Sequence, residues 1–180
     1  MTKRRQELRR QVLAARQRRQ RALRIGLIAV VVAISGGLLA WQNLRPAYGE
    51  KVTDLGNQHL AEGQTFDAYN TRPPTSGPHY NSKAPDGIHA EPIADELQVH
   101  NLEDGAVIIQ YDCPGGCDEL VAQLAELVSR YPSELILAPY PEMESRIALT
   151  AWGRIYRLED FDEERIISFI DAYRGIDHHR

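Results

Sequence analysis

Two cysteines, Cys113 and Cys117, are the first candidates for chemistry because they are the only thiols in the chain and stand four residues apart in the segment CPGGC. Pro114 and two glycines favour a turn in which both sulfurs face one point, and a predicted helix begins at Cys117, where the helix dipole stabilises a thiolate. Two thiolates suit Cu(I) or zinc. A plain disulfide and a redox-active thiol pair are the alternatives, and the spacing leaves all three open.

A second candidate is His79, which lies near the end of the stretch RPPTSGPHY at residues 72–80. Its prolines and glycine exclude a helix or a central strand, so the stretch predicts a rigid, kinked loop. Such a loop would fix His79 either as a ligand or as a hydrogen-bonded structural residue. His59, in a possible short helix over 54–62, is expected to face solvent.

His100 is a further candidate ligand beside His79, and the carboxylates of Glu103 and Asp104, which follow it, are possible additional ligands. Imidazole and carboxylate groups suit zinc, copper or iron. A predicted strand separates His100 from Cys113 by about 20 Å, because each strand residue adds roughly 3.3 Å. The sequence therefore does not favour one site that uses both the histidines and the cysteines.

The elements that position these residues are clearest after residue 105. Apolar runs predict strands at 106–111 and 134–139, and a hairpin of strands at 146–152 and 154–158 turning at Gly153. Apolar spacing of three and four predicts helices over 117–131, capped by Asp118, and over 163–173. The expected fold is α/β, bordering on α+β, with the order β-α-β-β-β-α and a loop-rich N-terminal extension.

Charge and hydropathy predict a membrane anchor before this domain. Residues 1–24 hold ten Lys or Arg and one acid, whereas the rest of the chain holds eleven basic and twenty-four acidic residues. Residues 25–44 carry no charge, and twenty helical residues span about 30 Å, the thickness of a bilayer core. Basic residues stay in the cytoplasm. We expect a single-pass membrane protein with a cytoplasmic N-terminus and the domain outside the cytoplasm.

Four regions are therefore expected: a basic cytoplasmic tail (1–24), a transmembrane signal anchor that contacts membrane lipid (25–44), a loop-rich extracytoplasmic segment (45–105) and an α/β core (106–175). The basic tail beside a membrane span indicates membrane topology, so no nucleic-acid partner is expected.

Five segments of the sequence resemble the domain of unknown function 3105. They are PPTSGPHY (73–80), VHNLEDG (99–105), VIIQY (107–111), IALTAWGR (147–154) and FDEERIISFIDAYR (161–174). That resemblance implies a bacterial membrane-anchored protein with one external domain, and it implies no chemistry. The usual word of the family is LEHG, and Asp104 stands here in place of its histidine.

Residues 106–173 resemble, more weakly, a thioredoxin fold without its middle helix, and the spacing of Cys113 and Cys117 is similar to that of Sco-type copper chaperones. That resemblance implies copper held by two thiolates and a histidine. The Sco-type histidine follows the cysteines, and here only His178 and His179 do so, so an upstream histidine would have to serve.

No nucleophile elbow, phosphate-binding loop or dinucleotide fingerprint occurs, so the sequence favours a protein that is not an enzyme. Metal binding or delivery, with copper or zinc as the cofactor, is the first expectation. Thiol–disulfide exchange is an alternative, and an accessory subunit of a membrane protein complex is another.

Overall fold

A computed structural model describes residues 26, 32, 33, 35 and 48–179, and the chain divides into two compact units, Met1–Pro46 and Ala47–Arg180. The predicted cytoplasmic tail and nearly all of the predicted anchor lie outside the described residues. Within the described part of the chain, no helix has the length and apolar character needed to cross a membrane. The second unit carries every element discussed below.

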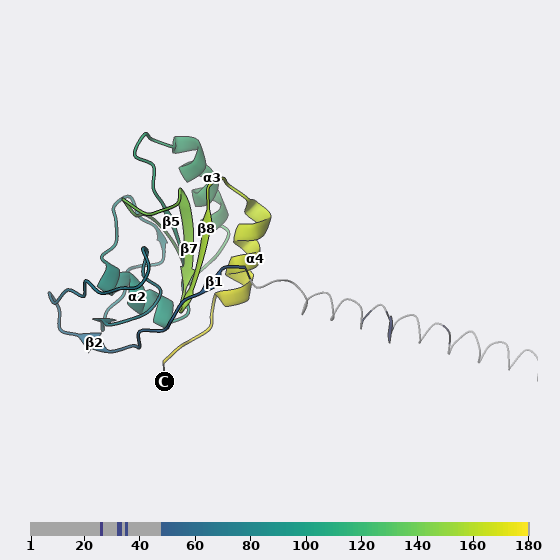
Figure 1. Ribbon diagram of the computed structural model, residues 1–180. Coiled ribbons are helices and arrows are strands. Elements are labelled where there is room, and N and C mark those ends of the chain that lie inside the picture. Colours follow the sequence, from purple (N-terminus) through teal and green to yellow (C-terminus); the bar gives the residue numbers. More distant parts are fainter. Residues whose placement is uncertain (1–25, 27–31, 34, 36–47, 180) are drawn as a thin grey trace, which may run out of the picture. The chain divides into compact units, whose positions relative to one another are not determined.

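A six-stranded sheet forms the centre of this unit, in the order β1-β8-β7-β5-β6-β4 (Figure 1). The strands are β1 (Glu50–Lys51), β4 (Gly87–Ile88), β5 (Val107–Tyr111), β6 (Leu135–Pro139), β7 (Ile147–Ala151) and β8 (Arg154–Leu158). β5 pairs in parallel with β6 and antiparallel with β7, and β7 forms the hairpin with β8. The fold is thus a mixed α/β fold, and β1 and β4 join the sheet from the segment predicted to be loop-rich.

Helices cover both faces of the sheet (Figure 1). On one face, α3 (Asp118–Val128) and α4 (Glu163–Tyr173) bury Leu124 and Phe169 against alternate strand residues such as Ile109. On the other face, α2 (Asp95–Glu103) buries Leu102 against Ile108. Because both faces are covered, β5 is apolar at the consecutive positions 107–109 rather than at alternate positions.

The strands and helices predicted after residue 105 all occur, with small differences at their ends. α4 begins as expected, because the Asp162 carboxylate accepts a hydrogen bond from the backbone N–H of Arg165 at 3.1 Å. The predicted cap of α3 is wrong: Cys117 is the N-cap, and Asp118 is the first helical residue. The acid still lies in the first turn, where the helix dipole favours a negative charge.

The predicted helix over 54–62 is also wrong. This segment is extended and contains β2 (His59–Leu60), which pairs in parallel with β3 (His79–Tyr80). The carbonyls of Gly56 and Gln58 accept hydrogen bonds from the backbone N–H groups of Gly77 and His79 at 2.9 and 3.0 Å. These bonds to a distant loop replace the local ones that a helix would need.

Candidate metal centre

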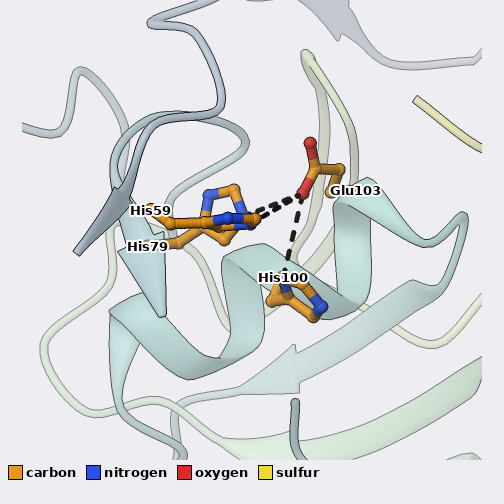
Figure 2. A group of neighbouring side chains, drawn as sticks. All are labelled: His59, His79, His100 and Glu103. Carbon is orange, nitrogen blue, oxygen red and sulfur yellow. Dashed lines mark hydrogen bonds and ion pairs between the residues drawn. The ribbon is translucent and has the colours of Figure 1, made fainter. Parts of the chain in front are cut away.

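Three imidazole rings surround one carboxylate oxygen, Oε2 of Glu103 (Figure 2). This oxygen lies 2.9 Å from Nε2 of His79, 3.7 Å from Nε2 of His59 and 3.8 Å from Nδ1 of His100. The ring centres lie 5.0 to 5.6 Å apart. The four side chains, which we call the inner cluster, converge on one point.

The pairing of β2 with β3 places two of these histidines side by side, because His59 is the direct partner of His79. The stiff loop before β3 is itself buried from Pro73 to Gly77. Ser76 Oγ accepts a hydrogen bond from the backbone N–H of Leu55 at 3.0 Å. The loop is therefore packed and hydrogen-bonded in the metal-free fold, as expected from its proline-rich sequence.

The last turn of α2 supplies the other two members of the inner cluster. His100 and Glu103 stand three residues apart, so they lie on one face of the helix. A carboxylate at a helix C-terminus is disfavoured by the helix dipole. The imidazoles around Glu103, and an amide hydrogen bond to it, offset that cost.

Hydrogen bonds from outside the inner cluster set the direction of its ligand atoms. The carbonyl of Gly77 accepts a hydrogen bond from His79 Nδ1 at 2.8 Å, because a carbonyl cannot donate. Nε2 of His79 faces Glu103 and donates a hydrogen bond to its Oε2 at 2.9 Å, so a metal ion bound at this nitrogen would displace that proton. Asn57 donates to Oε1 of Glu103 at 2.7 Å, which leaves Oε2 for the histidines. Metal-binding histidines and carboxylates are typically oriented in this way.

Burial makes the inner cluster chemically unusual. The side chains of His79 and Glu103 are 0% and 1% exposed, and Nδ1 of His100 is buried without a hydrogen-bond partner among the described residues. Burial lowers the pKa of His100, so that imidazole is kept neutral. Burial alone would raise the pKa of Glu103, but hydrogen bonds from Asn57 and His79 outweigh it and hold the pKa below its usual range. A neutral His100 and an ionised Glu103 are the protonation states in which these two groups bind a metal.

The spacing of the inner cluster fits a metal ion. In a tetrahedral site with bonds of about 2.0 to 2.1 Å, the ligand atoms lie roughly 3.4 Å apart. The distances from Glu103 Oε2 to the three imidazole nitrogens, 2.9 to 3.8 Å, bracket that value. A small cation could be held with little rearrangement.

A second group of potential ligands adjoins the first and consists of His100, Asp104 and His179. Oδ1 of Asp104 lies 3.8 Å from Nε2 of His100 and 3.6 Å from Nε2 of His179. Nε2 of His179 also lies 3.5 Å from Oε2 of Glu103, so the two groups are in contact. Asp104 thus lies beside the predicted cluster and does not join His79 and Glu103 in the inner one.

Cys113 and Cys117 are joined by a disulfide bond. They follow the carboxyl end of β5, whereas the inner cluster lies near its amino end, so the two candidate sites are separate, as the sequence predicts. Neither potential metal group found among the described residues contains a cysteine. Of the predicted ligands, the structure brings together His79, His100 and Glu103.

His59 and His179 are the two potential ligands that the sequence reasoning missed. His59 was expected to face solvent, and its side chain is 43% exposed, yet its Nε2 reaches the inner cluster. His179 lies near the end of the chain, and the backbone N–H of His178 donates to the carbonyl of Glu103 at 2.8 Å. The only sequence signal for either residue is that it is a histidine.

Comparison with known proteins identifies a family for this chain. A family model described as "Protein of unknown function (DUF3105)" matches residues 59–179, a span that begins at His59 and ends at His179. No curated protein and no solved structure matches the chain. Because the family model covers more than half of the sequence, the chain belongs to the DUF3105 family.

Proposed function

We propose that this protein binds a transition-metal ion, copper or zinc, through His59, His79, His100 and Glu103. The observation that carries the proposal is the convergence of three imidazole nitrogens on Oε2 of the buried Glu103, at spacings that suit bonds to one ion. Three nitrogens and one carboxylate oxygen suit Cu(II) or Zn(II), and Cu(II) is the tighter binder of the two. The role is to hold or deliver the ion.

The test is elemental analysis of the purified full chain without an added histidine tag. The metal-free protein is incubated with Cu(II) or Zn(II) in separate samples and desalted. Bound metal is expected in the unmodified chain, and His59→Ala should weaken its binding at least tenfold. His59 is the ligand of choice because it is the most exposed member of the inner cluster, so its removal leaves the core intact.

His89→Ala is the matched control, since His89 belongs to neither group of potential ligands. Its metal content should equal that of the unmodified chain. Absence of bound metal from the unmodified chain, or equal binding in the His59→Ala variant, would overturn the proposal.

We propose further that the ion is handled outside the cytoplasm by a domain anchored through residues 25–44, and that a membrane protein complex receives it. The basic tail and the acidic remainder of the chain support this orientation, and a disulfide is typical of an oxidising compartment. Protease added to intact cells stripped of their wall should degrade the domain and spare the tail. Protection of the domain would contradict the orientation.

A second candidate function is thiol–disulfide exchange in a thioredoxin-like domain. The strand order β8-β7-β5-β6 with β7 antiparallel supports that comparison, and the disulfide lies where α3 begins, with both cysteines partly exposed. A helix N-terminus stabilises the thiolate that such exchange needs. Reduction of insulin disulfides by the chain, lost in Cys117→Ser, would support this function, and its absence would exclude it.

A further inference from the structure

His100 turns its two ring nitrogens toward two different carboxylates. Nδ1 lies 3.8 Å from Oε2 of Glu103, and Nε2 lies 3.8 Å from Oδ1 of Asp104. The two nitrogens of an imidazole point away from each other in the ring plane, so one ion cannot bind both. Each nitrogen therefore belongs to a different group of potential ligands.

The C-terminal tail brings His179 to the second group. The backbone N–H of Gly175 donates to the carbonyl of Gly105 at 2.8 Å, and the backbone N–H of His178 donates to the carbonyl of Glu103. A side chain at Gly105 would begin 2.8 Å from the backbone nitrogen of Ile176, so the tail packs directly on this glycine. The tail is thus held at the end of α2 by its backbone.

Asp177 orients the imidazole of His179. Its carboxylate accepts a hydrogen bond from Nδ1 of His179 at 2.7 Å, which leaves Nε2 free to bind an ion. This nitrogen faces two carboxylate oxygens, Oδ1 of Asp104 at 3.6 Å and Oε2 of Glu103 at 3.5 Å. A carboxylate behind a histidine is the usual support for a metal ligand. Lys83 pairs with Oδ2 of Asp104, so Oδ1 faces the two histidines.

The second group is more open than the inner cluster. Its side chains are 12%, 24% and 47% exposed at His100, Asp104 and His179. It borders a cavity of about 300 Å³ whose lining is mainly acidic and includes Asp86, Asp104, Glu134 and Asp177 beside Lys83. Acidic walls raise the local concentration of cations.

We propose that the chain binds two metal ions and that His100 bridges them as an imidazolate. The inner ion is held by His59, His79, Glu103 and Nδ1 of His100. The outer ion is held by Nε2 of His100 together with Asp104 and His179. This inference rests on the proposed function, because it places the second ion next to the first.

Formation of the imidazolate bridge requires only the loss of one proton from His100. Neutral imidazole has one N–H, so binding an ion at each nitrogen releases that proton to water, and no oxidant or reductant is needed. With four protein ligands the inner ion is closed to solvent, whereas the outer ion has three and keeps a position for water or a small ligand. The inner ion is therefore retained, and the outer ion exchanges.

The test combines copper analysis with electron paramagnetic resonance on the full, untagged chain loaded with Cu(II). Two copper ions per chain are expected, with a resonance much weaker than the chemical copper content, because spins joined through an imidazolate couple to each other. His179→Ala and Asp104→Asn should each leave one copper with full resonance intensity. His89→Ala, as the control, should behave like the unmodified chain.

The outcomes separate the two proposals. One copper per chain, or two with full resonance intensity, would overturn the bridge and leave the inner site standing. Absence of copper would overturn both. Weak resonance at two coppers, restored to full intensity at one copper in His179→Ala, would establish the bridge.

Discussion

At the scale of single residues, Glu103 is the group on which the site depends. It is buried at the unfavourable end of a helix, and its carboxylate is stabilised by an amide on one oxygen and imidazoles on the other. His79 and Glu103 were predictable as partners because each stood in an unusual segment of sequence. His59 was not predictable, because its contact depends on pairing with a strand twenty residues away.

Asn57 is expected to act as a positioning residue. Asn57→Ala removes the donor to Oε1 of Glu103 and frees the carboxylate to rotate away from the histidines. We expect metal affinity to fall by about tenfold or more, the usual cost of losing a group that orients a ligand. A competition titration with a chelator measures the change. Asn81→Ala, at an exposed asparagine, is the control, and an equal loss there would contradict this role.

The metal-free fold is expected to lose stability in acid. Burial lowers the pKa of His100 below its ordinary value of 6.5, so just below that pH the unfolded chain binds a proton that the folded chain excludes. Stability therefore falls as the pH drops through this window. Glu103, whose pKa is also lowered, adds a loss at still lower pH.

The urea concentration at the midpoint of unfolding, measured for the metal-free chain from neutral pH downward, tests whether stability falls in acid. His100→Gln should flatten the first part of the fall because it removes the titrating group. A midpoint that rises on acidification through the same window would contradict the assignment.

At the scale of elements, the predictable parts are those whose apolar residues repeat with a period. β5, α3, β6, the β7–β8 hairpin and α4 all have such patterns. α2 was missed because the residues that it buries are mostly polar. Its Gln98 accepts a hydrogen bond from Gln110 of β5 at 2.5 Å, and Asn101 donates to the carbonyl of Ala84 at 2.9 Å. The two-residue strands were missed because their pairing is entirely non-local.

Gly105, which follows the C-cap of α2, allows the tail to pack against that helix. It has a φ of +92°, and a Cβ there would clash with the backbone of Ile176. We expect Gly105→Ala to destabilise the fold by more than the roughly 1–2 kcal/mol that a left-handed alanine costs and to displace His179. Urea unfolding measures the loss.

Gly63→Ala is the matched control for this element. Gly63 has a similar φ of +85°, and no atom lies within 4 Å of the position that a Cβ would take there, so only the backbone cost applies. Equal destabilisation of the two variants would show that the contact with the tail is unimportant.

At the scale of the whole molecule, the length of β5 separates the disulfide from the inner cluster. The disulfide lies beyond its carboxyl end, and the inner cluster lies beside the helix that precedes its amino end, roughly 17 Å of strand away. Cys113→Ser/Cys117→Ser should therefore leave the metal content unchanged. The double variant should lose only about 2 kcal/mol of stability, because the disulfide closes a very short loop. Elemental analysis measures the metal content and urea unfolding measures the stability. Loss of metal in this variant would show that the cysteines are ligands.

The segment from residue 53 to residue 80 contributes no side chain to the apolar clusters formed by the described residues. Hydrogen bonds from Asn57 and from the backbone of Phe66 attach it to helix α2, and its two-residue ladder carries two of the proposed ligands. Such a segment opens at a lower free energy than the core does. Bound metal would then slow the opening of this segment. The amide hydrogens of Gly77 and His79 would exchange slowly with solvent in the metal-loaded protein and quickly after the metal is removed by a chelator. The amide hydrogens of β5 would exchange at the same rate in both states.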